Sequence, residues 1–556
     1  MYGTGEDADK LVGFKQNGVQ IKSYAYDELN RVTSETLNTT APVTTTYGYA
    51  DHATEEGRTS ALVETLKIGE NPQYRYEYDA NGNIVKEFCG NTLLYQYGYD
   101  GKNQLVSFSY PGLELDDAPA QYVYFYDNQG NLTSVVLTNG MEMETVSAYG
   151  YTDASWGDLL TSFNGAGITY DAIGNPLSYY DGRTFSWQNG RQLAVASVAE
   201  GFALFEYNEE GMRVKKTVDG SFAGVTTYVY DGNLLLREKK TNPVTGAVIH
   251  DLYFTYDEAG RPFSMTDTYE TLYYAYDLYG NVKYLYDAYG NVNAEYIYND
   301  PWGKSVTFLG APFELASYNP FTYKGYYYDA ELEMYYCGSR YYDPDTCRWL
   351  NADGYVSTGQ GILGNNMFAY CLNNPVMLVD VEGELAYPAE IHNAVVRYVA
   401  NQYKHKYPQN KIYMEKRVIF SNAHYGRVDL VDSEGYIWDV KRDTPNHISR
   451  GIRQVRWYVS GSIVGVKDPL KVGDYSIFAG RFYYTSASGT YLVTYRNAGC
   501  GVIAYDYVLK KPKPEPQPSS ELSLEPFLGG ILVAGLLGTI SWLTSGASTA
   551  LVFALV

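Results

Sequence analysis

Apolar and polar positions alternate along the first 300 residues and predict a long series of β-strands. Residues 74–78 read Tyr-Arg-Tyr-Glu-Tyr, and residues 95–99 read Tyr-Gln-Tyr-Gly-Tyr. Successive strand side chains point to opposite faces, so a period of two predicts strands with one buried face lined by tyrosine. A second alternating run follows the first after a short gap, as at 83–86. Each unit is therefore predicted to be a β-hairpin.

A recurring phrase, Tyr-Asp followed closely by Gly-Asn or Gly-Arg, marks the turn of these hairpins. It begins at Tyr78, Tyr126, Tyr170, Tyr256, Tyr276 and Tyr286. Glycine tolerates a positive φ, and Asp or Asn can bond the local backbone, so the phrase is typical of a tight turn. The Asp positions often recur at about 20 to 30 residues, the range of repeat architectures. Hairpins in series predict a long, curling antiparallel sheet that ends near residue 383.

Composition adds a second module to this picture. The 61 tyrosines raise the aromatic content to 16%, which favours β-structure. The net charge of −22 is uneven, because residues 386–511 hold 18 Lys and Arg against 10 Asp and Glu. That window carries +8, four of the six histidines lie in it, and the rest of the chain carries −30. Such a break predicts two modules with different partners, of which the basic one can face phosphate.

Other sequence signals exclude several classes of site. The five cysteines are scattered without CxxC or zinc spacing, which supports neither a disulfide framework nor a metal knuckle. The GxGxxG match at 359–364 has no βαβ context, so we do not expect nucleotide binding there. No basic, hydrophobic leader precedes the repeats, and we expect the chain to be the C-terminal part of something longer.

The segment from residue 300 to 385 carries the most specific motifs. It contains Asp-Pro-Trp-Gly at 300–303, Asn-Pro-Phe-Thr-Tyr-Lys-Gly at 319–325, Arg-Tyr-Tyr-Asp-Pro at 340–344 and Asn-Asn-Pro-Val at 373–376. With the Tyr-Asp units, these motifs resemble the YD repeats and associated core of the RHS family, which includes teneurins and the C component of insecticidal ABC toxins. The resemblance implies a mainly β shell, or β-cocoon, from repeats at 1–299, closed by a core at 300–385 and enclosing a C-terminal toxin.

The resemblance also implies an intramolecular aspartyl protease that releases the C-terminal segment. The Arg-x-x-Asp-x9-Asp spacing of ABC-toxin relatives corresponds to Arg340, Asp343 and Asp353. Two carboxylates sharing one proton can activate water and protonate a carbonyl. The alternative is that Asp343, which precedes Pro344, is only a turn residue. Relatives end the core with Asp-Pro-x-Gly-Leu, whereas this chain has Val381 in place of the proline.

The basic window at 386–511 predicts a smaller α/β domain. A helical face opens near 388–399, a strand follows near 418–420, and a hairpin at 426–441 turns at Asp-Ser-Glu-Gly. A second helix is expected at 448–458, with strands at 475–484 and 490–495. Helix, hairpin with Asp and Asp-x-Lys, then helix resembles the PD-(D/E)xK nucleases, with their restriction-endonuclease-like fold.

That resemblance assigns a metal-dependent nuclease site. Asp429 and Asp439 come from paired strands and would hold Mg²⁺, a cation that prefers carboxylate oxygen, with help from the Val440 carbonyl. Lys441 shares a strand face with Asp439 and can orient water or stabilise the phosphate. Further family positions are the helix residues Glu390, a metal ligand, and Gln454, and the phosphate contacts His447, Arg450 and Arg453. The alternatives are a solvated hairpin with surface charges, or a metal-independent RNase using His424 or His447.

Beyond the window lie a proline-rich linker at 512–525 and an uncharged, apolar tail at 526–556. The tail is long enough to span a bilayer; a frayed gene end and a segment packed in the shell are alternatives. The resemblances imply an RHS-type polymorphic toxin, secreted or at the cell surface, that delivers a nuclease into competitor or host cells and has a cognate immunity protein. The rivals are a non-enzymatic adhesion or carbohydrate-binding protein and a toxin that disrupts membranes through the tail.

Overall fold

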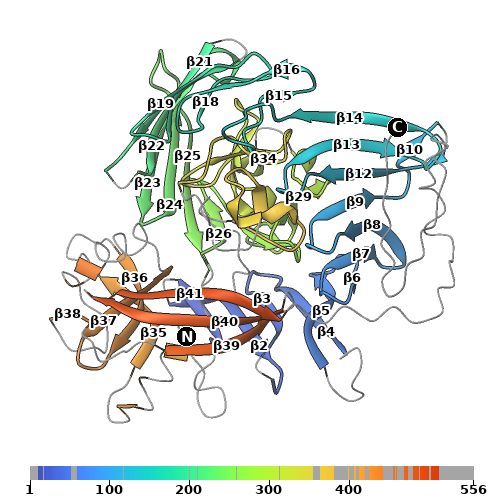
Figure 1. Cartoon of the computed structure of the whole chain (residues 1–556). Helices are drawn as coiled ribbons and strands as arrows, with labels where there is room; N and C mark the ends of the chain where they lie inside the picture. The colour runs from blue at the N-terminus through green and yellow to red at the C-terminus, as the bar shows by residue number, and fades with distance from the viewer. Residues whose placement is uncertain are drawn as a thin grey trace.

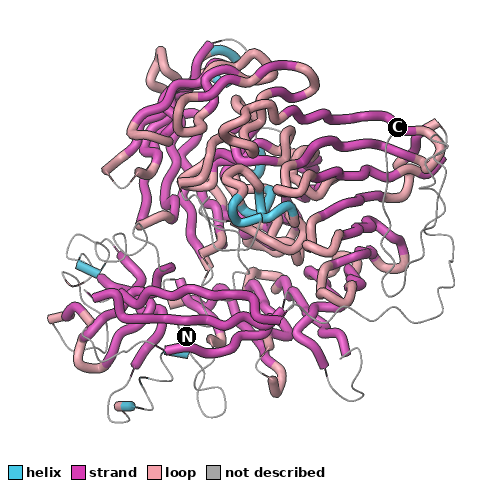
Figure 2. The backbone as a smooth tube through the Cα atoms, in the orientation of Figure 1, coloured by secondary structure: helices cyan, strands magenta, loops and turns pink. Residues whose placement is uncertain are grey.

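The computed structural model describes most of the repeats and core and part of the C-terminal window. The described residues are 11–16, 18–29, 31–51, 59–116, 118–198, 201–209, 211–257, 260–311, 314–354, 363–380, 398–399, 403, 406–407, 412–419, 425–442, 455–456, 459, 469–473, 480–486, 489–499 and 502–511. They are dominated by strands, with short helical segments (Figure 2). The prediction of a mainly β protein is confirmed for this part of the chain.

Two long antiparallel sheets form the repeat region, and strands follow one another in chain order. The first sheet contains β1 (Gly13–Gln16), β2 (Val19–Tyr26), β3 (Val32–Leu37), β4 (Val43–Asp51), β5 (Thr59–Ile68), β6 (Tyr74–Tyr78), β7 (Ile84–Cys89), β8 (Thr92–Tyr99), β9 (Leu105–Ser109), β12 (Gln121–Tyr126), β13 (Leu132–Thr138), β14 (Met143–Gly150), β15 (Ser162–Phe163) and β16 (Ala166–Gly167). Two small pairs accompany it, β10 (Glu114–Leu115) with β11 (Ala118–Pro119), and β17 (Thr169–Tyr170) with β18 (Pro176–Ser178).

The second sheet continues the meander. It contains β19 (Phe185–Gln188), β20 (Gln192–Val198), β21 (Gly201–Tyr207), β22 (Arg213–Val218), β23 (Gly224–Asp231), β24 (Leu234–Thr241), β25 (Val248–Tyr256), β26 (Pro262–Thr266), β27 (Thr271–Tyr276), β28 (Val282–Tyr286), β29 (Val292–Tyr298) and β30 (Val306–Gly310), with the 3₁₀ turn η2 (Gly220–Phe222). Together the two sheets curl around a centre, as Figure 1 shows. The predicted series of hairpins is confirmed.

The turn phrase works as its chemistry predicts. In the turn after β6, Asp79 Oδ1 accepts the N–H of Asn81 at 2.8 Å and of Asn83 at 2.9 Å. Its other oxygen accepts Asn83 Nδ2 at 2.9 Å, and Gly82 has a φ of 85° that a side chain would disfavour. The same pattern recurs at Asp127, Asp171, Asp277 and Asp287. Each carboxylate therefore satisfies the backbone of its own turn.

The tyrosine of the phrase connects neighbouring units. Tyr99 donates its hydroxyl to the carbonyl of Ile84 at 2.9 Å, and Tyr126 donates to Leu105 at 2.8 Å. In both cases the acceptor directly follows the preceding turn. The equivalent bonds of Tyr78, Tyr151, Tyr256 and Tyr298 repeat this link along the meander. The aromatic ring fills the core while its polar end finds a partner, which is why tyrosine suits the position.

The last strands of the second sheet contact the first sheet. Tyr95 on β8 donates to the carbonyl of Tyr298 at 2.8 Å, and Asn71 donates to Tyr286 Oη at 2.8 Å. Tyr279, in the turn after β27, donates to Glu87 on β7 at 2.7 Å. The curl is thereby joined to itself by contacts between residues about 200 positions apart.

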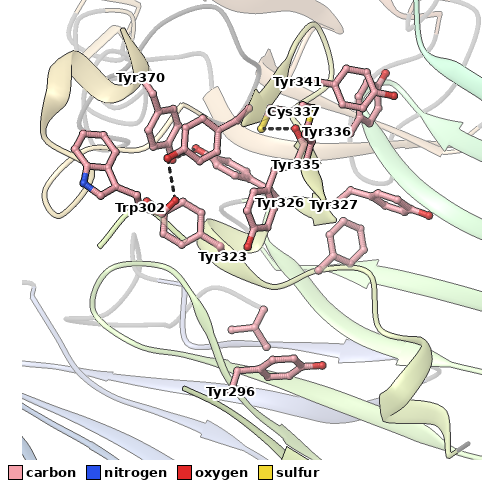
Figure 3. Close-up of a cluster of buried hydrophobic side chains, with 14 of the residues drawn as sticks. Tyr296, Trp302, Tyr323, Tyr326, Tyr327, Tyr335, Tyr336, Cys337, Tyr341 and Tyr370 are labelled. Carbon is pink, nitrogen blue, oxygen red and sulfur yellow. Dashed lines mark hydrogen bonds between the residues drawn. The ribbon is translucent and has the colours of Figure 1, made fainter. Parts of the chain in front are cut away.

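The core segment lies within the curl (yellow in Figure 1). It contains η3 (Leu315–Tyr318), η4 (Tyr323–Gly325), η5 (Leu363–Asn365), η6 (Tyr370–Asn373) and a small sheet of β31 (Tyr327–Asp329), β32 (Met334–Tyr336), β33 (Tyr341–Asp343) and β34 (Arg348–Trp349). Its tyrosines pack ring against ring (Figure 3), as in the stack of Tyr342 on Tyr370 with centroids 3.8 Å apart. The predicted core of the shell is thus packed with aromatic rings, and we call this core segment the aromatic plug.

The plug contacts the turns of the repeats directly. Asn373 Nδ2 donates to Gln104 Oε1 at 3.0 Å and to the Gly130 carbonyl at 2.8 Å. Asn366 Nδ2 donates to Asn131 Oδ1 at 2.8 Å, and the backbone N–H of Lys324 donates to Asn281 Oδ1 at 2.9 Å. Gln104, Asn131 and Asn281, the last residues of their turns, therefore have two roles, because each bonds its own Asp and also contacts the plug.

A third body follows the core in the sequence. Its sheet runs β35 (Ile412–Ile419), β36 (Tyr425–Asp432), β37 (Tyr436–Arg442), β41 (Val502–Lys511), β40 (Gly489–Gly499) and β39 (Gly480–Ser486), with β38 (Lys471–Val472) beside β37. The family resemblance implied that the shell encloses this module. In Figure 1 these strands lie outside the curl, whose centre the aromatic plug occupies.

The structure describes part of the α/β module predicted at 386–511. The hairpin is confirmed as β36 and β37, while β35 and β40 are longer than the strands expected there. Residues 398–399, 403, 406 and 455–456 are helical. The strand β41 was not predicted, because its buried stretch from Val502 to Tyr505 gives a continuous apolar run rather than an alternation. No helix among the described residues is long and apolar enough to cross a membrane, and the tail at 526–556 lies outside them.

Candidate functional sites

The first candidate site surrounds Arg340, which directly precedes β33. Its Nη2 lies 2.9 Å from Asp353 Oδ2 and 3.5 Å from Asp380 Oδ2. All three side chains are at most 5% exposed. The guanidinium also stacks over Trp349, 4.1 Å from the ring centroid, and donates to the Met367 carbonyl at 3.2 Å. One fixed cation therefore holds two buried carboxylates.

Asp343, the remaining member of the predicted protease constellation, has other partners. Its Oδ2 accepts the Tyr179 hydroxyl at 2.6 Å and the Thr346 hydroxyl at 2.9 Å. Its Oδ1 accepts the N–H of Asp345 at 2.9 Å, which is a turn contact. Burial raises the pKa of the Asp343 carboxyl, while the charge of Arg183 opposes the rise. The structure thus brings Arg340 and Asp353 together and ties Asp343 to a turn and to the shell.

Asp380 was not predicted as a site residue. The signal lay in the sequence, because Asp380 is the Asp at the start of the motif that ends the core. Its backbone N–H donates to Tyr326 Oη at 2.9 Å, so it joins the aromatic plug as well as Arg340. Residues 381–397, which include Val381 and the expected cleavage position near 385, lie outside the described residues.

The second candidate site is the β36–β37 hairpin. Leu430 pairs with Trp438, and both are fully buried. Asp429 and Asp439 each lie one residue beyond this pair, on β36 and β37 respectively. Opposed residues of antiparallel strands share a face, so this register places the two positions as neighbours. Lys441 lies two residues further along β37, on the same face as Asp439.

The strand β37 changes partner at this point. Asp439, Val440 and Lys441 pair in parallel with Val502, Ile503 and Ala504 of β41. A parallel pair requires a crossover, and helical residues 455–456 lie on it. The predicted positions Glu390, His447, Arg450, Arg453 and Gln454 lie outside the described residues, as does His424.

Packing shows how the hairpin is supported. Tyr403, in a helical segment, donates to Asp432 Oδ2 at 2.6 Å and lies 5.4 Å from the Trp438 ring. Asp432 Oδ1 accepts the N–H of Glu434 and Tyr436, the same turn geometry as in the repeats. Val455 is fully buried. The helical residue Tyr403 packs on the hairpin through both Asp432 and Trp438.

Among the described residues, no group of three or more His, Cys, Asp and Glu side chains is placed to hold a metal ion. Of the predicted metal ligands, Glu390 lies outside the described residues, and the structure describes only the backbone positions of Asp429 and Asp439.

Comparisons with known proteins bear on the fold of the chain. No protein-family model matches the chain. The chain is similar to the Tc holotoxin pore of Photorhabdus luminescens in a TccC3 mutant form (TM-score 0.52) and to TcdB2–TccC3 (TM-score 0.51). Each match has 21% identity and covers 66% of this chain. The matches cover 19% of the holotoxin chain and 20% of the TcdB2–TccC3 chain. The chain has the shell fold of these Tc toxin structures.

Sequence relatives point the same way. The chain is 33% identical over 359 residues to the tRNA3(Ser)-specific nuclease WapA of Bacillus spizizenii and to the tRNA nuclease WapA of Bacillus subtilis. It is 27% identical over 366 residues to the toxin subunit YenC1 of Yersinia entomophaga. Each match covers 56% of this chain. The chain spans 15% of the length of the two WapA proteins and 36% of YenC1. These relatives support the resemblance to RHS toxins.

Proposed function

We propose that the chain is part of an RHS-type bacterial toxin whose repeat shell and core carry a nuclease at residues 386–511. The similarity to two WapA nucleases carries this proposal. The hairpin supports it independently, since its register puts Asp429 beside Asp439 with Lys441 on the same face. The module is basic, which suits a phosphate-rich substrate.

In the proposed site, Asp429 and Asp439, with the Val440 carbonyl and Glu390, would hold a divalent cation such as Mg²⁺. The cation would supply charge neutralisation at phosphorus and an activated water. Lys441 would orient the water or stabilise the charge that develops on the phosphate. Gln454 belongs to the same proposed site, and His447, Arg450 and Arg453 would position the nucleic acid through its backbone phosphates.

We propose RNA, and tRNA in particular, as the substrate, because the WapA relatives are named as tRNA nucleases. The test is to incubate the full chain with tRNA, total RNA and plasmid DNA, with Mg²⁺ or with EDTA. We expect tRNA cleavage that requires the metal and is lost in Asp439→Ala and Lys441→Ala. Arg481→Ala is the matched control, because it removes an exposed positive charge on β39, away from the hairpin. Equal activity of wild type and both hairpin variants would exclude this site.

We further propose that the core cleaves its own chain near residue 385. Asp353, held by Arg340, would act with a second carboxyl to deliver water to the carbonyl carbon and a proton to the leaving nitrogen. The amide bond breaks, a carboxyl and an amine form, and no other reactant is needed. Wild type should give two fragments and Asp353→Ala one intact band. A single intact band from both proteins would exclude self-cleavage.

By analogy with RHS toxins, we propose that the protein is secreted, that its nuclease is delivered into a target cell, and that a cognate immunity protein binds the nuclease. Membrane contact through residues 526–556 belongs to this proposal. Expression of the full chain should arrest growth of a bacterial host, and Asp439→Ala should relieve the arrest. Arrest that persists in Asp439→Ala but is lost on deletion of the tail would favour a membrane-disrupting toxin instead.

A further inference from the structure

The repeat shell contacts the core directly beside Asp353. Ala352, the preceding residue, is fully buried and donates its N–H to the carbonyl of Gly174 at 3.1 Å. Gly174 lies in the turn between β17 and β18 and has a φ of 83°. A Cβ at that position would lie 2.8 Å from the Cβ of Ala352, so glycine suits this close approach. The backbone before a candidate proteolytic carboxyl is therefore held by a turn of the shell.

Arg191, in the turn between β19 and β20, contacts the same position. Its Nη1 donates to the carbonyl of Ala352 at 3.0 Å and to the carbonyl of Ile173 at 2.6 Å. Burial lowers the pKa of Arg191, and the negative charge of Asp353 opposes that fall, so these two groups also interact electrostatically. Asp353 thus interacts with two arginines, Arg340 of the core and Arg191 of the shell.

The other side of Asp353 is held through Met367. The Met367 carbonyl accepts the Asp353 N–H at 2.9 Å and the Arg340 guanidinium at 3.2 Å. The Met367 N–H in turn donates to Asp158 Oδ2 at 3.0 Å. Asp158 lies between β14 and β15 of the first sheet, whereas Arg191 belongs to the second. Both sheets of the shell therefore hold the backbone around Asp353.

We propose that the shell residues Arg191 and Asp158 are positioning residues for Asp353, so that the repeat shell completes the proteolytic site of the core. This inference rests on the proposed self-cleavage. The two residues fix the backbone on either side of Asp353, and the Arg191 cation also favours the ionised carboxylate that can deliver water. The carboxylate of Asp380, which shares Arg340 Nη2 with Asp353, opposes this effect of the arginines.

The test follows self-cleavage of the freshly synthesised full chain with time and at several pH values. Arg191→Gln should slow cleavage about 10- to 100-fold, because small misplacements of a reacting group change rates on that scale. The acidic limb of its pH profile should also move to higher pH by about one unit, since a carboxylate that loses a neighbouring cation binds its proton more tightly. Arg191→Lys keeps the charge and should restore that limb. Arg237→Gln, the same change on β24 where Arg237 lies 2.6 Å from Asp251, should behave as wild type.

Asp158→Ala provides a second variant should Arg191→Gln fail to fold. It removes the acceptor for the Met367 N–H and should slow cleavage, while Asp158→Asn keeps an acceptor oxygen and should restore the rate. A wild type that stays intact at every pH would overturn self-cleavage and this inference with it. A wild type that cleaves, with Arg191→Gln and Asp158→Ala matching its rate and pH profile, would overturn the role of the shell and leave self-cleavage standing. A slower Arg191→Gln with an unmoved acidic limb would reduce Arg191 to a structural residue and would also overturn the proposal.

Discussion

At the scale of single residues, buried charges join the shell to its plug. Arg213 on β22 and Asp329 on β31 form an ion pair in which neither side chain is exposed to solvent. Lys216 lies 2.5 Å from the same carboxylate. The Arg213 guanidinium also faces four aromatic rings at 4.3–5.6 Å, those of Phe205, Tyr228, Tyr327 and Tyr336. These charges fix one arrangement of shell and plug, because Arg213 and Lys216 would lose a shared buried carboxylate partner if Asp329 were displaced.

Arg213→Met is therefore expected to destabilise the protein strongly. Removing one member of a buried pair typically costs about 3–5 kcal/mol, and we expect a value near the lower end here, because Asp329 stays buried but keeps Lys216 as a partner. The control is Arg75→Met, because Arg75 and Glu77 are each about two-fifths exposed and such a pair contributes ~1 kcal/mol or less. Thermal unfolding followed by circular dichroism measures both variants. Equal melting temperatures for the two would contradict the structural role of Arg213.

Glu87 lies where the first sheet contacts the second, and we expect it to make the stability of the protein depend on pH. Burial raises the pKa of Glu87 to about 8, although Tyr279 donates a hydrogen bond to it. The folded protein thus keeps the proton that the unfolded chain loses near pH 4.5. Stability is full below that pH and falls by about 1.4 kcal/mol per pH unit until the folded pKa is reached. Between pH 5 and 8 the melting temperature of Glu87→Gln should fall less steeply than that of wild type. Parallel slopes would exclude Glu87 as the source.

At the scale of elements, the hairpin units were predictable because their information is local. The alternation of apolar and polar residues predicted the strands. The Tyr-Asp phrase predicted the turns, including the role of Asp79. Two assignments were not predictable. The spacing from Arg340 to Asp343 and Asp353 does not determine which carboxylate reaches the guanidinium, and the structure adds Asp380. The strand β41 was missed because burial on both faces removes the alternation. For the β36–β37 hairpin, the sequence predicted the strands and the structure adds the register.

Turns with the same sequence phrase should differ in how much they contribute to the stability of the fold. Asn131 is fully buried and bonds Asp127, the Gly157 carbonyl and Asn366 of the plug. Asn291 bonds Asp287 in the same way but is exposed. Asn131→Ala should cost about 2–3 kcal/mol, because it leaves buried partners unsatisfied, while Asn291→Ala should cost about 1 kcal/mol or less. Chemical denaturation measures the difference. A larger loss in Asn291→Ala would contradict the dual role of the buried turn residues.

At the scale of the whole molecule, closure comes from contacts that no local pattern encodes. The first sheet meets the second through pairs such as Tyr95 with Tyr298, more than 200 residues apart. The plug holds both sheets, with Asn373 on the turns of the first and Asp329 on β22 of the second. Each sheet alone would expose its tyrosine-lined face. We infer that the shell and plug stabilise one another and unfold together.

Hydrogen exchange can test this coupling, since opening of a cooperative unit exposes all of its amides at once. Asn373→Ala removes plug contacts to the first sheet only, at Gln104 and Gly130. We expect faster exchange at those turns and also in β22 to β24 of the second sheet. The reason is that the same plug contacts both sheets, through Asn373 at the turns and through Asp329 at β22, so loosening it at one sheet should loosen it at the other. Asn291→Ala, on an exposed turn, should change exchange only locally. Faster exchange confined to residues 100–131 in Asn373→Ala would show that the two sheets open independently.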